Sequence, residues 1–524
     1  MPSMIPRAAL ALFCVAAPLA GALAQPARHG EAPRAQQGEG PAPRGGPGSP
    51  QANAPASAPA MAPLPADKTT RHAITLQDGR TLAFLATAGS IRLANRDTGA
   101  PVADIAFLAF ELDAPARAQR PVAFAMNGGP GYASAWLNLG AMGPWRLRMD
   151  EEAARPSAPA SLETNAQTWL PFTDLVFLDP AGTGYSRTLG GDDTRKWLWS
   201  VNGDIDSLAT TIRRWLEARG RGGSPVTLVG ESYGGFRVPK IAHRLQVDQG
   251  VGVSALALVS PVLDFGRLHA RRSLFDLVAR LPAYAAGARA AASRADLADV
   301  ESYARGEYLA DLMRGVNDAP ALARLTAQVA RLTGLPSDVV ARHAGRVPLE
   351  AYVAEIARAQ GKVPSLYDAR VLGLDPSPYG EGPDADDQMR LGLHAPIVQA
   401  MVGLYRDKLE WVVPDGRYQF QNEQAGRQWD WSERSRQESV RDLQRAMALD
   451  PALRTLIVHG LTDLVTPYFE TQMVLDQLPR TGDPARLRFE VYAGGHMFYS
   501  REASRSRFRD DARALIAGEP AARP

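Results

Sequence analysis

One short segment, residues 226–235, constrains the fold of this chain more than any other. It reads Val-Thr-Leu-Val-Gly-Glu-Ser-Tyr-Gly-Gly, so an apolar run ends abruptly in Gly-x-Ser-x-Gly. The run predicts a buried strand, and the stretch 236–245 that follows is compatible with a helix. Gly230 and Gly234 let the chain reverse sharply between the two, which places Ser232 in a strained turn above the end of the strand. Ser232 is therefore a candidate nucleophile, and the alternative is an ordinary strand-to-helix turn.

Other short apolar runs lack alternation between apolar and polar residues, which is typical of strands buried on both faces of a sheet. Before them, an alternating pattern around the turn dipeptide Asp78-Gly79 predicts a β-hairpin. Stretches of helical period separate the runs, and the clearest spans 204–219 with Asp204 as its expected cap. This order predicts an α/β protein with a mixed, mostly parallel sheet flanked by helices. The expected strands cover residues 72–76, 81–86, 105–112, 122–126, 175–178, 226–229, 255–259, 455–458 and 487–491.

The alternation of strands and helices stops after Asp264. From 265 to 390 the chain is rich in Ala, Leu, Arg and Glu at helical spacing, and no strand is predicted there. We expect a helical insertion, which is either a cap over the sheet edge where ligands bind or a packing appendage. The expected core then has two parts, 68–264 and 391–524.

The first 67 residues have the composition of an export signal followed by a linker. Arg7 precedes an apolar run that closes with Ala22-Leu-Ala24, so residues 1–24 are interpreted as a signal peptide rather than a signal anchor. Residues 25–67 are dominated by Pro, Ala, Gly, Gln and Ser, which predicts a disordered linker. Cys14 is the only cysteine and lies in the signal. We therefore expect an exported protein, periplasmic or secreted, without disulfides.

A serine hydroxyl becomes a strong nucleophile only when a base takes its proton and a third group orients that base. In chains with a serine at such a turn, the acid and then the histidine follow it in sequence. His496 lies in a glycine-rich loop directly after a strand, and Asp463 follows the strand 455–458. We therefore predict Ser232, Asp463 and His496 as a catalytic triad. His459, at the end of the same strand as Asp463, is interpreted as a packed histidine.

The segment Asn-Gly-Gly-Pro-Gly at 127–131 also follows an expected strand. Acyl transfer needs backbone N–H donors that are in place before the negative oxygen forms. Gly129 is the predicted first donor of this oxyanion hole, and Tyr233, the residue after the nucleophile, is the second. The alternative is that the glycines form a plain turn.

Taken jointly, these segments resemble the serine carboxypeptidase family, in the family's order, from about residue 105 to 500. The resemblance implies an α/β-hydrolase fold and the same triad and oxyanion donors. The matching segments are Asn127-Gly-Gly-Pro-Gly131, Asn165-x-x-x-Trp169, Val176-Phe-Leu-Asp179, Gly182-x-Gly-Tyr-Ser186, Gly230-Glu-Ser-Tyr-Gly-Gly235, Val238-Pro239, Gly460-x-x-Asp463 and Gly494-Gly-His-Met497.

The resemblance also implies that Asn127, Gly128 and Glu231 bind the terminal carboxylate of a peptide substrate. A carboxyl group beside a carboxylate is favourable only if the two share a proton, so binding is expected to weaken as the pH rises. The chain departs from the family's pattern at three positions. Ala141 stands where the family usually has a second glutamate, Ala125 replaces a tryptophan, and Tyr132 replaces a frequent cysteine.

These observations predict a serine exopeptidase of carboxypeptidase type that acts on peptides through an acyl-enzyme. The alternatives are an aminopeptidase, an esterase or an acyltransferase on the same fold, or a non-catalytic envelope binding protein. A net charge of +2 gives no reason to expect nucleic acid as a partner, and no stable membrane insertion is expected after signal cleavage. No cofactor and no metal are expected, since the sequence has no phosphate loop, dinucleotide fingerprint or metal-ligand cluster.

Overall fold

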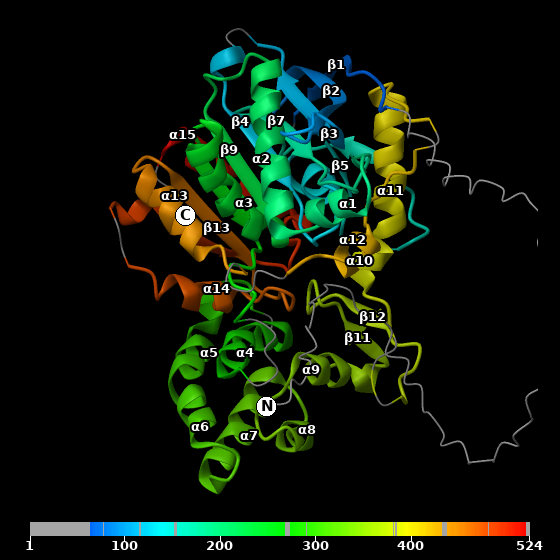
Figure 1. Ribbon diagram of the computed structural model, residues 1–524. Helices are drawn as coiled ribbons and strands as arrows, with labels where there is room; N and C mark the ends of the chain where they lie inside the picture. The colour runs from blue at the N-terminus through cyan, green and yellow to red at the C-terminus, as the bar shows by residue number, and fades with distance from the viewer. Residues whose placement is uncertain are drawn as a thin grey trace, which may run out of the picture.

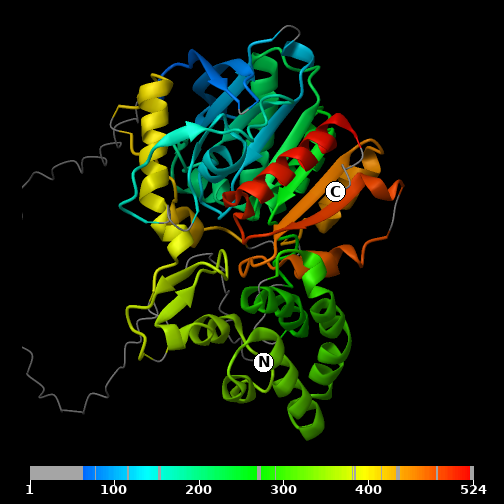
Figure 2. The same cartoon turned by 180° about the vertical axis from the view of Figure 1, so that it is seen from behind.

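A mixed sheet of ten strands forms the centre of the molecule, with helices on both faces (Figures 1 and 2). The structure is a computed structural model and describes residues 63–76, 78–114, 117–150, 155–267, 273–289, 291–380, 382, 385–414, 416–431, 437–479 and 482–519. The strands of the sheet are β1 (Lys68–Thr75), β2 (Thr81–Ala94), β3 (Pro101–Leu112), β4 (Val122–Met126), β7 (Asp174–Leu178), β8 (Arg187–Thr188), β9 (Val226–Glu231), β10 (Ala255–Val259), β13 (Arg454–Gly460) and β14 (Leu487–Tyr492).

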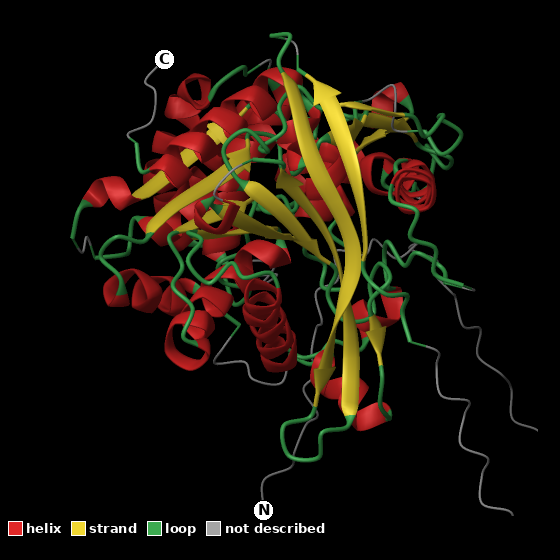
Figure 3. Cartoon of the chain, turned by 90° about the horizontal axis from the view of Figure 1, so that it is seen from above, coloured by secondary structure: helices red, strands yellow, loops and turns green. Residues whose placement is uncertain are grey.

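The strand order across the sheet is β1-β2-β3-β7-β4-β9-β10-β13-β14, and β8 pairs with β3. All pairs from β7 to β14 are parallel, whereas β1, β2, β3 and β8 pair antiparallel. The sheet is strongly twisted, as the view from above shows (Figure 3). The predicted α/β fold with a mixed, mostly parallel sheet is confirmed, and so is the hairpin of β1 and β2.

Both faces of the parallel strands are buried, which explains why their residues do not alternate between apolar and polar. In β4, Val122, Phe124 and Met126 pack in one cluster, and Ala123 and Ala125 in the other. The first cluster includes helices α2 (Val201–Ala218), α3 (Tyr233–Arg244) and α13 (Val440–Leu449), and the second includes α11 (His394–Gly403) and α15 (Glu502–Ala517). Figure 2 shows α15 in red across the face opposite α2 and α3.

The chain between β10 and α11 forms most of a separate body beneath the sheet in Figure 1. Its apolar cluster continues onto Leu461, Leu464, Tyr468 and Phe469, which lie after β13 and in α14 (Tyr468–Leu475). Contrary to the expectation of helices alone, it contains a two-stranded sheet of β11 (Lys362–Pro364) and β12 (Leu372–Leu374). Three-residue strands are too short to produce a recognisable alternation. Its helices are α4 (Leu274–Ala288), α5 (Ala298–Tyr303), α6 (Leu309–Arg314), α7 (Ala319–Thr333), α8 (Ser337–Arg342), α9 (Leu349–Glu355) and α10 (Gln388–Gly392).

Smaller elements complete the described part of the chain. They are β5 (Trp145–Leu147), β6 (Leu162–Thr164), α1 (Asp192–Leu198) and α12 (Glu423–Arg427).

Two details differ from the sequence-based expectations. Helix α2 is capped by Ser200, whose hydroxyl accepts from the Gly203 amide, whereas Asp204 is buried inside the helix and pairs with Arg237. The predicted signal peptide and most of the predicted linker lie outside the described residues. The end of the linker, 63–67, is packed: Leu64 is buried, and Asp67 forms an ion pair with Arg219.

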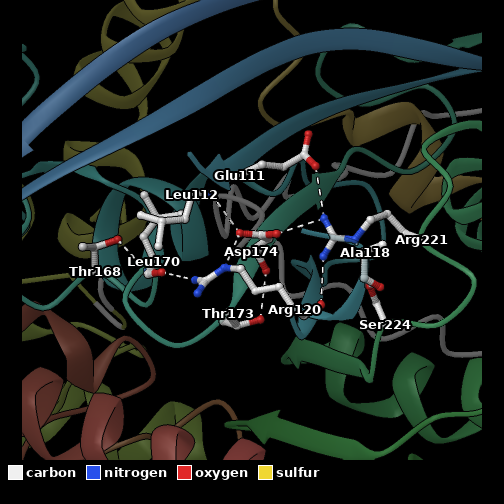
Figure 4. A network of polar contacts seen from close by, with 10 residues as sticks. All are labelled: Glu111, Leu112, Ala118, Arg120, Thr168, Leu170, Thr173, Asp174, Arg221 and Ser224. Atoms are coloured by element: carbon white, nitrogen blue, oxygen red, sulfur yellow. Dashed lines mark hydrogen bonds and ion pairs between the residues drawn. The ribbon is translucent and has the colours of Figure 1, made fainter. Parts of the chain in front are cut away.

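A buried network of charged residues ties strand ends together at the amino edge of the parallel strands (Figure 4). The guanidinium of Arg221 donates to Asp174 (2.9 Å), at the start of β7, and to Glu111 (3.1 Å), near the end of β3. It also donates to the carbonyl of Arg120, which lies before β4. Arg120 in turn donates to Asp174 at 2.8 Å. The network therefore joins β3, β7 and the segments that lead into β4 and β9.

Candidate active site

The loops after β4, β9, β13 and β14 lie at one edge of the sheet, because these strands are parallel. Such an edge, outside the carboxyl ends of the strands, is where ligands bind in open α/β sheets. Segment 127–131 follows β4, Ser232 follows β9, Asp463 lies three residues after β13, and His496 lies four residues after β14. The structure thus gathers the residues that the sequence analysis selected.

Ser232 occupies a strained turn between β9 and α3. Its φ of 60° and ψ of −121° lie in a region that residues with a side chain rarely adopt. The turn depends on its two glycines: a Cβ at Gly230 would lie 2.1 Å from the Gly234 carbonyl oxygen, and one at Gly234 would lie 2.4 Å from the Met126 carbonyl oxygen. The Ser232 amide donates to the Val259 carbonyl at 2.9 Å, which fixes the turn against β10.

Asp463 and His496 form a buried pair, with 2.7 Å between Oδ2 of the aspartate and Nδ1 of the imidazole. The other carboxylate oxygen of Asp463 accepts from the amides of Val465 (2.8 Å) and Thr466 (2.9 Å). The Thr466 hydroxyl lies 2.6 Å from Asp463 Oδ2 and 3.2 Å from His496 Nδ1. The carboxylate is therefore held by three donors besides the imidazole. Sequence reasoning missed Thr466, although a threonine three residues after an aspartate is a common turn signal.

The two histidines near this edge have opposite electrostatics. Burial by itself lowers the pKa of His496, but the carboxylates of Asp463 and Glu231 more than offset this, and the pKa is raised. Burial lowers the pKa of His459 to about 4. His459 lies 3.1 Å from the Thr466 carbonyl and 3.0 Å from the Thr471 hydroxyl, so both its ring nitrogens are occupied. His459 thus has the geometry of a packed histidine.

The glycine segment 127–131 lies directly against the nucleophile turn. A Cβ on Gly128 would lie 2.5 Å from the Tyr233 amide nitrogen and 2.6 Å from the Glu231 carbonyl oxygen. Gly129 has φ of +110°, and it lines the same cavity as Ser232. The side chain of Tyr233 is buried in the apolar cluster on the other side, so its backbone rather than its phenol adjoins the turn.

Arg237 connects the two segments that carry the predicted oxyanion donors. Its guanidinium pairs with Asp204 at 2.7 Å, donates to the Asn127 carbonyl at 2.6 Å and lies 4.9 Å from the centre of the Tyr233 ring. It is fully buried. Sequence reasoning missed this residue because an arginine on a helix usually faces solvent.

Glu231 is buried beside Ser232 and keeps its proton more strongly than an ordinary glutamate. Burial raises its pKa to about 7, against the opposing effects of His496 and of hydrogen bonds from Tyr499 and Asn127. The Tyr499 hydroxyl donates to Glu231 Oε2 at 2.6 Å. A carboxyl group with this pKa can donate a proton near neutral pH, as recognition of a second carboxylate requires.

Ser232, His496 and Glu231 line one small cavity of about 30 Å³, which is close to the volume of a single water molecule. The segment that precedes α11 contributes two residues to its wall, Tyr367 and Arg390. The other lining residues are Asn127, Gly128, Gly129, Tyr132, Trp136 and Met497.

The segment 365–371, between β11 and β12, hydrogen-bonds to both loops that carry the buried pair. The Tyr367 carbonyl accepts from the His496 amide at 2.5 Å, and the Leu366 carbonyl accepts from the Leu464 amide at 3.1 Å. Asp368 accepts from the Thr462 hydroxyl at 2.6 Å and from Arg501 at 2.7 Å. We call 365–371 the strap. Its contacts were not predictable, because no local pattern signals them.

Within the described ranges, no group of three His, Cys, Asp or Glu side chains is arranged to hold a metal ion. No helix in that part of the chain combines the length and the apolar character needed to cross a bilayer.

Sequence comparison with known proteins covers the segments around Asn127 and Ser232. The sequence model of the serine carboxypeptidase family matches residues 106–258. The pheromone-processing carboxypeptidase kex1 of Aspergillus fumigatus is 31% identical over 133 residues, which are 25% of this chain and 19% of that protein. The serine carboxypeptidase-like 40 protein of Arabidopsis thaliana is 31% identical over 134 residues, 24% of each chain. The matches thus span less than a quarter of the length of these relatives.

Among solved structures, the chain is similar to the prohormone-processing carboxypeptidase Kex1(delta)p from Saccharomyces cerevisiae, with a TM-score of 0.52. The two are 14% identical, and the superposition covers 83% of this chain and 91% of the other. At this identity the likeness concerns the fold, and the predicted α/β-hydrolase fold is confirmed.

Proposed function

From the match of the serine carboxypeptidase family model to residues 106–258, we propose that this chain is a serine exopeptidase of carboxypeptidase type. The observation that supports this proposal best is the arrangement at the sheet edge. A strained Ser232 shares a cavity with His496, which is paired with Asp463, and with a glutamate whose pKa is about 7. A serine hydrolase whose substrate has no carboxylate to be bound would not need Glu231 in this position.

In the proposed reaction, the Ser232 hydroxyl attacks the carbonyl of the last peptide bond while Nε2 of His496 takes its proton. Asp463 accepts a hydrogen bond from Nδ1, orients the ring and stabilises its positive charge. The amides of Gly129 and Tyr233 stabilise the oxyanion. His496 then protonates the departing amine, and water hydrolyses the acyl-enzyme by the same steps.

Glu231, Asn127 and Gly128 bind the terminal carboxylate in this proposal. The Asn127 amide and the Tyr499 hydroxyl hold Glu231, and a protonated Glu231 donates to the substrate. Two carboxylates in direct contact cannot both remain ionised, so one proton must lie between them.

We further place the enzyme outside the cytoplasm, in the periplasm or secreted. This part of the proposal depends on the amino-terminal sequence alone, in which Arg7, an apolar run and Ala22-Leu-Ala24 have the order of a cleaved signal.

The nucleophile is tested by labelling with a fluorophosphonate probe, which reacts with activated serines. We expect the native chain to be labelled and the Ser232→Ala variant not to be. Ser337→Ala, at an exposed serine on α8, is the matched control and should be labelled normally. Labelling that persists in Ser232→Ala would refute the assignment.

Peptides blocked at one end distinguish the proposed activity from its rivals on the same fold. A carboxypeptidase cleaves an amino-blocked dipeptide with a free carboxylate and releases the last residue. An aminopeptidase cleaves only peptides with a free amine, and an esterase prefers the corresponding ester. A chain that is labelled but cleaves only the peptides with a free amine would move the proposal to aminopeptidase.

A further inference from the structure

Arg390 is a buried cation in the wall of the cavity that holds Ser232. It lies on α10, and only 5% of its surface is exposed. Guanidinium groups remain charged in proteins, and a buried charge is strongly unfavourable unless it is paired. The side chain therefore needs a partner of opposite charge.

Among the described residues, no carboxylate oxygen lies within 4.0 Å of the Arg390 guanidinium. Its hydrogen-bond partners there are neutral: Gln421 Oε1 at 3.4 Å and the Tyr132 hydroxyl. Asp387 is nearby, but its oxygens accept from the Ser365 hydroxyl, the Leu366 amide and the backbone amide of Arg390 itself. Among the described residues, the guanidinium thus has no direct ion pair, and Arg390 lines the cavity.

The same cavity contains groups that suit one end of a peptide. Glu231 lines it as well, but this carboxyl group is held by Tyr499 and Asn127 rather than by Arg390. A substrate carboxylate bound in this cavity would be enclosed by a lining that includes both Arg390 and Glu231. A planar guanidinium matches the two oxygens of a carboxylate and forms two parallel hydrogen bonds with them.

We propose that Arg390 binds a carboxylate of the peptide substrate and so sets a preference for acidic groups next to the scissile bond. This inference deepens the proposed function and rests on it for the identity of the substrate. The carboxylate has two sources in a peptide: the terminal carboxylate and the side chain of an acidic residue. Both offer the same chemistry to the guanidinium.

Binding is measured by calorimetry in the full chain carrying Ser232→Ala, so that peptides are not consumed. The probes form two pairs. In the first, an amino-blocked dipeptide with a free terminal carboxylate is compared with its terminal amide. In the second, an amino-blocked dipeptide that ends in Glu is compared with the one that ends in Gln. We expect the charged member of at least one pair to bind more tightly. Adding Arg390→Gln should weaken that member about 30-fold or more and its neutral counterpart much less.

The pair that loses its preference identifies the source of the carboxylate. Arg417→Gln is the matched control: this arginine is exposed, lines a neighbouring groove, and should leave the preference unchanged. Arg390→Lys retains the charge without the planar fork and should weaken the charged peptide less than Gln does. Thermal melts establish whether each variant is folded.

The proposal is overturned if the Ser232→Ala protein shows no preference for either charged peptide, a result that needs no Arg390 variant. It is also overturned if Arg390→Gln weakens charged and neutral peptides equally. Failure of the proposed function gives a different result: the native chain would not be labelled by the fluorophosphonate. Calorimetry would still decide whether Arg390 binds a carboxylate.

Discussion

Glu231 and His496 influence each other's protonation, although they come from segments 265 residues apart. The carboxylate of Glu231 helps to raise the pKa of His496, and a positive His496 opposes the rise in the pKa of Glu231. In the proposed mechanism the two groups have opposite requirements. His496 must be free of its proton to act as a base, whereas Glu231 must keep its proton to bind a carboxylate.

The first prediction concerns the dependence of kcat/KM on pH. For a peptide with a free carboxylate, activity should fall at low pH as His496 gains a proton. The value of kcat/KM should also fall above about pH 7, where Glu231 loses its proton, by at most about tenfold per pH unit. The corresponding amide should lack the alkaline decline, because it brings no charge against Glu231.

Glu231→Gln tests whether Glu231 causes the decline at high pH (the alkaline limb) and His496 the decline at low pH (the acidic limb). The alkaline decline should disappear, and the acidic limb should move to lower pH because the negative charge that raises the pKa of His496 is gone. Glu470→Gln is the control: burial raises the pKa of Glu470 to about 8, but it does not line the cavity, so the profile should be unchanged. Activity on the free carboxylate that keeps rising to pH 9 would contradict the prediction.

At the scale of elements, the strap 365–371 connects the insertion to the candidate active site. Asp463 and His496, the proposed acid and base, lie on two loops, and the strap hydrogen-bonds to each of these loops. A cap that only covered the cavity could move as a rigid body without disturbing the Asp463–His496 pair. The strap restricts such motion, so we expect entry of substrate to depend on side chains such as Arg390 and Tyr132.

The second prediction is that Asp368→Asn lowers kcat while the fold remains. The Asn side chain keeps the shape but loses the negative charge that accepts from Arg501 and the Thr462 hydroxyl. Small displacements of a catalytic group reduce rates by as much as about 100-fold, so we expect a loss of about 10- to 100-fold.

The rate of fluorophosphonate labelling measures this loss independently of peptide binding. Asp311→Asn is the matched control, because Asp311 is also a buried carboxylate of the insertion and pairs with Arg324 at 2.6 Å without contacting the strap. It should label at the native rate. Equal loss in both variants would mean that the insertion acts through general stability.

At the scale of the whole molecule, the features of the candidate site and the buried ionic network lie at opposite edges of the sheet. The carboxyl edge has the strained serine and the cavity, whereas the amino edge has the buried network around Arg221 (Figure 4). Removing one partner of a buried ion pair leaves an uncompensated charge, which is strongly destabilising. Stability and activity should therefore respond to different substitutions.

The third prediction is that Arg221→Met lowers the free energy of unfolding by about 3 kcal/mol or more. Asp174 and Glu111 would lose the guanidinium that bridges them. In native buffer, kcat/KM should remain within about threefold of the native value, because the network lies at the edge away from Ser232.

Urea unfolding provides the measurement, and Arg219→Met provides the control. Arg219 pairs with Asp67 at 2.8 Å, but both side chains are partly exposed, and such surface pairs contribute about 1 kcal/mol or less. If the two variants had equal midpoints, the buried network would not be the source of stability that we describe.

The sequence alone predicted nine of the ten strands of the central sheet, the turn at Ser232 and the loops that lie at the carboxyl edge. These features depend on neighbouring residues: an apolar run predicts a strand, and Gly230 and Gly234 are required where a Cβ would overlap the backbone. The order of segments then predicted which loops share an edge, since parallel strands end on the same side. Ser232, Asp463 and His496 were selected in this way.

Only the tertiary structure decided which residues surround those three. Arg390, Tyr367 and the strap come from a part of the chain whose position depends on apolar packing over long sequence separations: Ala369 packs in the cluster with α14, and Tyr367, Val371 and Met389 pack in the cluster with α11 and α15. Arg237 and Asp204 likewise form a buried pair that no local pattern distinguishes from surface charges. Periodicity reports which side of an element is buried, but not what lies opposite, because that depends on contacts between distant segments.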